Sequence, residues 1–304
     1  MSAWLDRFDT QQARLMPELT VLRDEPMNRH TTFRIGGAAR RMVQVQTCAE
    51  LAALLSLAEE NEIPYFLLGN GSNLLVSDDG IDRLVIHTGA LDRLERVGED
   101  TLYAEAGVSL ARLAVFARKQ SLTGLEFAHG IPGSLGGAVC MNAGAYGGEM
   151  CQVVTEVTAW LPGRGECVLY AEELAMSYRH SYFSDHEGVV LGAKLKLSGG
   201  DESAIGAQME DLIRRRKEKQ PLEYPSAGST FKRPEGHFAG ALIEQCGLKG
   251  VSVGWAQVSE KHAGFVINTG GATCADVLSL IEKVRAVVLE QTGVELEPEV
   301  RMIR

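Results

Sequence analysis

A glycine-rich turn follows an apolar run in "LLGNGSN", residues 67–73. Glycine has no Cβ atom, so backbone N–H groups at Gly69 and Gly71 can approach a bound anion closely. The turn therefore predicts a phosphate or diphosphate site, and a β-turn without a ligand is the alternative. A Rossmann-type dinucleotide site is disfavoured, because Leu74 occupies the third glycine position and the residues that follow resemble strands rather than a helix.

A second glycine-rich stretch, "GIPGSLGGAVCMNAGAYGGE", covers residues 130–149. It keeps Ile, Leu, Val and Met side chains, which a flexible linker would lack, so we expect a packed loop. The two stretches together could line a groove for a long ligand with two negative charges, although packed structural loops are the alternative. A P-loop is excluded because the chain contains no Gly-Lys pair.

Short strands and amphipathic helices must position these loops. "HTTFRIGGAARRMVQVQT" predicts a strand pair with a glycine turn, and "CAELAALLSLAEENEI" predicts a helix with Thr47 as N-cap and Glu50 completing a capping box. Alternating segments predict strands over 63–69, 81–108, 152–199 and 263–269, and a closing strand over 294–303. Further helices are expected over 109–122, 202–220, 237–247 and 273–293.

The composition is that of a globular protein of two or three domains, with 304 residues, 45% hydrophobic and 23% charged. Thirty basic against forty acidic residues give a net charge of −10, which disfavours nucleic-acid binding. An N-terminus with charge in every turn and the lack of a long apolar run indicate a cytoplasmic protein without a membrane segment. The six dispersed cysteines are expected to be reduced thiols, and the absence of CxxC and HExxH motifs predicts no metal site.

Six motifs occur in order from about residue 28 to the end: "TTFRIGG", "LGNGSNLLV", "GIPGSLGGAVCMNAGAYGGE", "YRHSYF", "PSAGSTFKRP" and "EPEVRMI". Together they resemble the UDP-N-acetylenolpyruvoylglucosamine reductases, also called UDP-N-acetylmuramate dehydrogenases. The short spacing between "YRHSYF" and "GSTFK" is similar to that of the compact, type II-like subgroup. Arg233 differs from the asparagine usual in the longer subgroup, and His129 stands where a small residue is expected.

The resemblance implies the α+β fold class, with a vanillyl-alcohol-oxidase-type (PCMH-type) FAD-binding fold of two subdomains and a C-terminal α+β substrate-binding domain. We expect these parts at residues 1–80, 81–215 and 216–304. The implied cofactor is FAD, held without a covalent bond and reduced by NADPH. The implied product is UDP-N-acetylmuramate, formed from UDP-N-acetylglucosamine enolpyruvate for peptidoglycan synthesis, by a monomer or weak homo-oligomer.

Three residues are the catalytic candidates that the resemblance implies. Ser229 is the proton donor, Arg179 stabilises the enolate, and Glu299 positions or protonates the intermediate. Taken alone, each has an ordinary alternative: a turn serine, a surface arginine paired with Asp185 or Glu187, and a solvated glutamate at a strand edge.

The binding candidates form two sets. The cofactor set is Arg34, Gly69, Asn70, Gly71, Ser72, Asn73, Gly130, Ile131, Pro132, Gly133, Ser134, Gly136, Gly137, Asn142, Ala143, Gly144 and Gly148. The substrate set is Tyr178, Lys219, Lys232 and Arg233. Two other functions stay open from the residues: a flavin oxidase on the same fold, and a nucleotide-binding or flavin-sensing module without catalysis.

Overall fold

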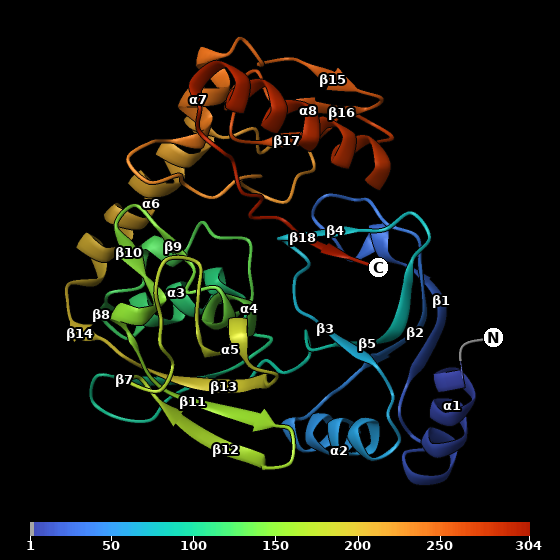
Figure 1. The fold of residues 1–304 in the computed structure, drawn as a ribbon. Coiled ribbons are helices and arrows are strands. Elements are labelled where there is room, and N and C mark those ends of the chain that lie inside the picture. Colours follow the sequence, from blue (N-terminus) through green and yellow to red (C-terminus); the bar gives the residue numbers. More distant parts are fainter. Residues whose placement is uncertain (1–2) are drawn as a thin grey trace. The chain divides into compact units, whose positions relative to one another are not determined.

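The computed structural model describes residues 3–304, which form two compact units (Figure 1). The first unit contains the residues up to Leu22, Arg41–Asn70 and Arg83–Arg215, and the second contains Arg23–Arg40, Gly71–Asp82 and Arg216–Arg304. The predicted division at 80/81 and 215/216 stays a prediction. The segment predicted as the first subdomain is divided between the two units. Phe33, Ile35 and Leu75 belong to the second unit, where they pack in the same core as the C-terminal helices.

A five-stranded antiparallel sheet of order β12-β11-β13-β7-β6 organises the first unit (Figure 1). Its strands are β6 (Leu94–Arg96), β7 (Thr101–Glu105), β11 (Val154–Leu161), β12 (Gly165–Tyr170) and β13 (Val189–Lys196). Buried side chains cover both faces: Val157 and Ala159 belong to one apolar core, and Trp160 belongs to another that includes Leu51 of helix α2 (Cys48–Glu60). The alternation of side chains along β11 explains this division.

Helices and small strands complete the first unit. The helices are α1 (Ala3–Leu15), α2 (Cys48–Glu60), α3 (Leu110–Lys119), α4 (Leu135–Cys140), α5 (Tyr182–Asp185) and α6 (Glu202–Lys219), with 3₁₀ turns η2 (Glu126–Ala128) and η3 (Met150–Gln152). The last turn of α6, from Arg216 onward, belongs to the second unit. The short strands are β3 (Tyr65–Leu68), β8 (Leu122–Thr123), β9 (Gly144–Ala145), β10 (Gly148–Glu149) and β14 (Ser198–Gly199). The expected helix over 202–220 is therefore confirmed, and it ends before Pro221, which cannot donate a helical N–H bond.

A four-stranded sheet of order β1-β2-β5-β3 contains strands that run from one unit into the other. These strands are β1 (Val21–Pro26), β2 (Ala38–Gln44) and β5 (Ile81–His87). The predicted N-cap of α2 is confirmed, since Thr47 Oγ1 accepts the Glu50 N–H at 3.1 Å. The Glu50 carboxylate accepts the N–H of Gln46 rather than that of Thr47, so the predicted capping box is displaced by one residue.

The second unit combines two helices with short strands. Its elements are η1 (Met27–Arg29), β4 (Leu74–Val76), α7 (Ala239–Gln245), β15 (Ser252–Val253), β16 (Ala256–Val258), β17 (Val266–Asn268), α8 (Cys274–Thr292) and β18 (Arg301–Ile303). Helix α8 lies against the β15-β16-β17 sheet, and β18 pairs with β4 in parallel (Figure 1). Among residues 3–304, none of the helices has the length and apolar character that crossing a bilayer requires.

Helix α8 has well-defined ends and a buried stripe, as its sequence predicts. Thr273 and Asp276 form a reciprocal capping box, and Gly293 ends the helix with φ 71°. The buried side chains include Val277, Leu280, Ile281, Val284 and Val288, which follow the helical period. In addition, both carboxylate oxygens of Asp78 accept N–H groups of the first turn, from Cys274 at 2.7 Å and Ala275 at 3.0 Å.

Replacing Asp78 by alanine is expected to lower the free energy of unfolding by about 1–2 kcal/mol. The substitution removes two charge-assisted hydrogen bonds at the positive end of α8. Chemical denaturation followed by circular dichroism measures the change. Asp79→Ala is the matched control, since Asp79 is exposed next to Asp78, and it should change stability by less than about 0.5 kcal/mol. Equal effects of the two substitutions would contradict the capping role.

One local prediction is wrong and another is incomplete. Residues 31–37 form no strand, because Arg34 N–H donates to Thr31 O in a turn and Arg34 has φ 56°. The glycine-rich stretch 130–149 is packed as expected, with Leu135 and Val139 buried, but it also contains helix α4, which its glycines concealed.

Candidate active site

The first glycine of the turn at residues 69–73 lies directly against the second glycine-rich stretch. A Cβ atom on Gly69 would lie 2.4 Å from Ser134 Oγ, so a larger residue would displace one of the two. Ser134 is buried and its backbone forms an isolated β-bridge with Ser109. Gly69 and Ser134 both belong to the first unit, so the structure brings the two predicted segments together there.

The second half of the turn directs a backbone N–H away from Thr32. Gly71 O accepts the N–H of Thr32 at 3.2 Å. In a planar trans peptide the C=O and the following N–H point in opposite directions. The N–H of Ser72 therefore points away from Thr32, which is the orientation that an anion-binding turn needs.

Glycines of the second stretch serve different purposes. A Cβ on Gly137 would meet no atom within 4 Å, whereas a Cβ on Gly136 would lie 3.0 Å from Ala106 Cβ. The Gly136 N–H also donates to Ala106 O at 2.8 Å. Gly136 therefore permits close packing, and Gly137 faces open space in which a ligand can approach it.

The other predicted cofactor residues of this stretch are half-buried or exposed. They are Gly130, Ile131, Pro132, Gly133, Ala143, Gly144 and Gly148. Gly144 and Gly148 lie on the small β9-β10 hairpin, where a Cβ on Gly148 would lie 2.4 Å from the Phe127 ring. The small size of the Gly148 residue lets this stretch pack directly on Phe127. Contact of these residues with a cofactor stays a prediction.

Asn142 is fully buried, and its side chain is engaged within the protein. Its amide Nδ2 donates to Glu149 Oε2 and to Ser177 O, both at 3.0 Å, and its Oδ1 accepts the N–H of Cys151 at 2.9 Å. The Asn142 amide therefore joins the glycine-rich stretch to the turn that follows Ser177. These bonds leave the Asn142 side chain engaged within the protein, so they do not support its predicted contact with the cofactor.

Arg179 occupies a strained position in a two-residue turn. Ser177 and His180 exchange backbone N–H···O bonds of 3.1 Å on either side of the turn. Arg179 has φ 55°, a left-handed conformation in which a long side chain is uncommon. Its Nη2 donates to Gly144 O at 3.4 Å, and the guanidinium carbon lies 5.1 Å from the centre of the Tyr178 ring. The protein thus holds this arginine in a defined place.

One of the two alternative partners suggested for Arg179, Asp185, contacts another residue. Asp185 Oδ2 lies 2.9 Å from His180 Nε2. Tyr178 is exposed, which suits a predicted substrate contact. Backbone strain of the kind found at Arg179 is common at functional sites.

Ser229 and Glu299 come from two neighbouring segments of the second unit. The N–H of Glu299 donates to Thr230 O at 2.8 Å, and the N–H of Lys232 donates to Glu297 O at 2.8 Å. Ser229 precedes Thr230 directly, is exposed, and follows Gly228 with φ 78°. The structure therefore brings two of the three catalytic candidates into adjacent backbone, while Arg179 belongs to the first unit.

The predicted closing strand is shorter than expected and does not contain Glu299. Strand β18 covers only Arg301–Ile303, and before it Pro298 forms an isolated bridge with Phe231. Proline has no N–H to continue a ladder, which explains the interruption. Glu299 is half-buried. It therefore lies in a bent segment rather than at a strand edge.

The predicted substrate cations have defined surroundings. Lys232 forms an ion pair with Glu297, the glutamate two residues before Glu299. The Arg233 guanidinium carbon lies 4.6 Å from the centre of the Phe238 ring, and both residues are exposed. Lys219 is the last residue of α6 and is exposed. A substrate diphosphate would compete with Glu297 for Lys232.

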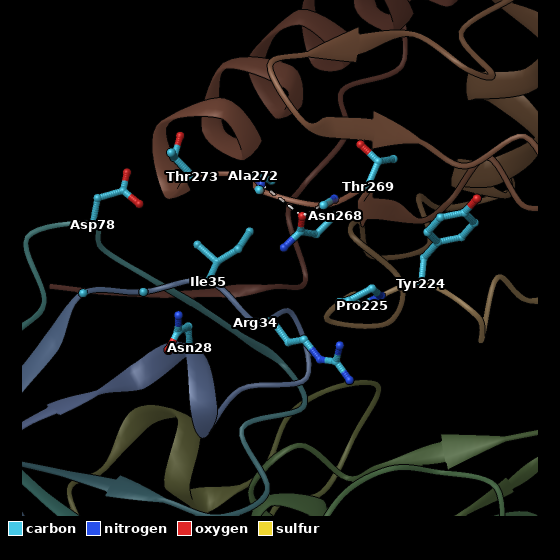
Figure 2. Close-up of a pocket in the computed structure, with 14 residues that line it drawn as sticks. Asn28, Arg34, Ile35, Asp78, Tyr224, Pro225, Asn268, Thr269, Ala272 and Thr273 are labelled. Atoms are coloured by element: carbon cyan, nitrogen blue, oxygen red, sulfur yellow. Dashed lines mark hydrogen bonds between the residues drawn. The ribbon is translucent and has the colours of Figure 1, made fainter.

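A cavity of about 570 Å³ lies within the second unit (Figure 2). Its lining consists of Asn28, residues 34–37, Asp78, Tyr224, Pro225 and residues 268–273. Figure 2 shows Asp78 and Tyr224 at opposite ends of it. Of the predicted cofactor residues, Arg34 lines this cavity. Asn268 fixes the opposite wall, because its Oδ1 accepts the N–H groups of Gly270 and Ala272, each at 3.0 Å.

Sequence patterns missed Asn268 and Tyr224 as cavity residues. Asn268 ends a short strand inside "AGFVINT", and its buried amide is recognisable only after folding brings it to Phe33 O at 3.2 Å. In the part of the chain that is described, residues 3–304, no group of three His, Cys, Asp or Glu side chains could hold a metal ion. All six cysteines are free thiols, as expected.

Comparison with known proteins decides the family. The family model for the "UDP-N-acetylenolpyruvoylglucosamine reductase, C-terminal domain" matches residues 220–303, and a "FAD binding domain" model matches residues 39–169. Reductases of this name from Caldanaerobacter subterraneus subsp. tengcongensis and Clostridium novyi are 49% and 51% identical to the chain. These matches cover 95% and 91% of the chain and 95% and 90% of the relatives. The chain belongs to the UDP-N-acetylenolpyruvoylglucosamine reductase family.

A solved reductase of this family has the same fold. The structure of the Thermus caldophilus enzyme superposes with a TM-score of 0.80 at 36% identity, covering 94% of this chain and 99% of that one. The predicted α+β architecture with a PCMH-type FAD-binding fold is therefore confirmed. The FAD-binding match includes both glycine-rich stretches, and the C-terminal reductase match includes Ser229 and Glu299.

The glycine turn fits the FAD that the reductase family uses. A Cβ on Gly71 would lie 2.0 Å from His30 O, and Gly71 has φ 59°. Only glycine can hold this left-handed backbone so close to the His30 carbonyl oxygen. A close-packed glycine turn of this kind suits a diphosphate, and contact of Gly69–Asn73 and Gly137 with FAD stays a prediction.

Gly71→Ala is expected to yield a protein with little bound FAD. The methyl group would collide with the His30 carbonyl oxygen, and left-handed backbone costs a non-glycine residue about 1–3 kcal/mol. The ratio of flavin to protein absorbance after purification measures the loss. Gly163→Ala is the matched control, because Gly163 has φ 67° but no atom within 4 Å of a Cβ. Normal FAD content in Gly71→Ala would refute the role of the turn.

His129, the departure from the reductase pattern, lies next to Gly130. Its Nδ1 atom is buried and has no hydrogen-bond partner in the structure of residues 3–304. Burial lowers the pKa of His129 below its usual value, and the nearby Arg118 lowers it further. The imidazole is therefore neutral at neutral pH and adds no charge to the loop.

Proposed function

We propose that Ser229, Arg179 and Glu299 carry the chemistry of this flavin-dependent reductase. The protein catalyses the NADPH-dependent, FAD-mediated reduction of UDP-N-acetylglucosamine enolpyruvate to UDP-N-acetylmuramate. When bound, FAD would supply the hydride transfer, with NADPH as the source of the hydride and one carbon of the enolpyruvyl double bond as its destination. The adjacent carbon must then receive a proton, and the charge that develops on the carboxylate side must be stabilised.

The close association of Ser229 and Glu299 supports their assignment to proton transfer. Glu299 is hydrogen-bonded through its backbone to the residue after Ser229. A serine hydroxyl is a weak acid in water, so the site must polarise it before it can donate a proton. We assign the donor role to Ser229 and assign to Glu299 the positioning or protonation of the intermediate.

Arg179 is assigned to the substrate carboxylate and enolate. A guanidinium can form two parallel hydrogen bonds with a carboxylate. The strained turn fixes its backbone, and Tyr178 lies against its guanidinium, which reduces the mobility of the side chain before substrate binds. This role requires that Arg179 and the Ser229–Glu299 pair contact the same substrate molecule.

The substrate diphosphate is assigned to Lys219, which is exposed, and Lys232, which is half-buried, with Arg233 and Tyr178 as additional substrate contacts. Arg34, at the cavity of the second unit, is assigned to FAD. A monomer or weak homo-oligomer in the cytoplasm is the expected state, and sedimentation of the FAD-loaded protein tests the oligomeric part.

An anaerobic titration tests the reaction. The flavin absorbance of the FAD-loaded protein should bleach with NADPH and return when UDP-N-acetylglucosamine enolpyruvate is added. Flavin that bleaches with NADPH but returns only with oxygen would instead indicate a flavin oxidase. Protein that binds no FAD at all would refute both assignments.

A further inference from the structure

Asn73, the last residue of the glycine turn, holds the segment that carries Glu299. Its side-chain Nδ2 donates to Glu299 O at 3.0 Å, and its own carbonyl accepts the N–H of Arg301 at 3.0 Å. The parallel pairing of β18 with β4 begins at the next step, with Arg301 opposite Leu74. Asn73 therefore bonds to the residues on both sides of Val300, immediately before β18 begins.

The opposite side of the Glu299 backbone is held by the segment that follows Ser229. The N–H of Glu299 donates to Thr230 O at 2.8 Å. Thr230 is itself buried and fixed, since its N–H donates to Gly264 O at 2.8 Å and its Oγ1 accepts the N–H of Val266 at 2.9 Å. The N–H of Glu299 is thus bonded to Thr230, which is itself bonded to β17, and the C=O of Glu299 is bonded to the glycine turn.

These two bonds fix the peptide groups on both sides of the Glu299 Cα. The direction of the Glu299 side chain follows from its backbone, because the Cα–Cβ bond is set by the two flanking peptides. Pro298 and the bend at Val300 leave the segment outside regular ladder bonding. The Asn73 amide consequently supplies a constraint that a continuous strand would supply through its own backbone bonds.

We propose that Asn73 is a positioning residue that aligns Glu299 for the protonation step, and that it does so through its amide bond to Glu299 O rather than by contact with FAD. The inference rests on the function proposed above for Glu299. It assigns Asn73 a task different from the cofactor contact that its place in the turn suggests. Because Asn73 belongs to the turn itself, it also joins the FAD-binding backbone directly to the proton-transfer segment.

Two variants test the proposal in the FAD-loaded enzyme. Asn73→Ala removes the amide, and Asn73→Asp keeps the size of the side chain but places an oxygen opposite Glu299 O. Misplacement of a catalytic group by about 1 Å costs roughly 10²-fold. We therefore expect both variants to slow reoxidation of reduced flavin by the enolpyruvyl substrate by about 10- to 100-fold, while reduction by NADPH stays within about 2-fold of wild type.

Asn61→Ala is the matched control, because Asn61 Nδ2 also donates to a backbone carbonyl, that of Leu57, at 2.8 Å at the end of α2. It should leave both half-reactions unchanged. The pH dependence of reoxidation should shift in the Asn73 variants, because loss of the Asn73 amide bond displaces the Glu299 carboxyl group. It should not shift in Asn61→Ala, because Asn61 is not bonded to Glu299. In addition, Asn73→Ala combined with Glu299→Gln should be no slower than Glu299→Gln alone.

The remaining outcomes are distinguishable. Wild-type enzyme that the enolpyruvyl substrate cannot reoxidise would refute the proposed function and this inference with it. Wild-type activity together with normal reoxidation in both Asn73 variants would overturn the positioning role alone. Loss of bound FAD, or equal slowing of the two half-reactions, would also overturn it and would return Asn73 to the cofactor contacts.

Discussion

Ser229→Ala should leave the reduction of bound FAD by NADPH nearly intact and slow its reoxidation by the enolpyruvyl substrate by roughly 10²- to 10⁴-fold. This range is the usual cost of losing a general acid. The hydroxyl is exposed on a loop whose next residue, Thr230, is anchored, so the substitution should not disturb the fold. Rapid-mixing measurements of flavin absorbance separate the two half-reactions.

Ser203→Ala provides the control for Ser229→Ala, since Ser203 is an exposed residue near the start of α6. It should behave as wild type in both half-reactions. If Ser229→Ala slows both half-reactions equally, Ser229 is not the proton donor. A solvent isotope effect on reoxidation that is present in wild type and altered in the variant would support the assignment independently.

Arg179→Ala should lower kcat by about 10²- to 10³-fold, the loss typical of removing a donor that stabilises developing negative charge. Arg179→Lys should recover only part of this loss. Lysine keeps the charge but offers a single point of contact, and it cannot reproduce two parallel bonds to a carboxylate. Steady-state kinetics with both variants measure the difference.

Arg164→Lys is a suitable control for Arg179→Lys, because Arg164 is exposed in the turn between β11 and β12. It should retain wild-type kcat. Wild-type turnover in Arg179→Lys would refute bidentate recognition. A rise in KM with unchanged kcat would instead assign Arg179 to substrate binding without a role in stabilising the enolate.

Local sequence patterns predicted the regular elements well. The apolar stripe and the terminal Thr273 and Gly293 of α8 are encoded by neighbouring residues, and so is the N-cap Thr47 of α2. Such features depend on short-range hydrogen bonds and periodicity, which a sequence displays directly. The resemblance of six ordered motifs predicted the family.

Features that depend on distant contacts were not predictable in this way. Helix α4 is hidden by its glycines, and the break before β18 depends on Pro298 meeting Phe231. Asn142 was assigned to the cofactor because it lies in a glycine-rich stretch. The hydrogen-bond partners of its side chain, including Ser177, lie up to 35 residues away, and its contact with the cofactor stays a prediction. No local pattern shows where a buried amide finds its partners.

The second unit is built from three separate segments of the chain, and this has a consequence for folding during synthesis. Its early segments, Arg23–Arg40 and Gly71–Asp82, pack with Arg216–Arg304, and β4 pairs with β18 at residues 301–303. On the ribosome these early segments must wait, without their final partners, until residues 216–303 have emerged. Long-range pairing of this kind slows folding and leaves apolar surface exposed in the meantime. A nascent chain arrested before Arg301 should therefore remain sensitive to protease at Leu74–Val76, whereas the released full-length protein should be protected there.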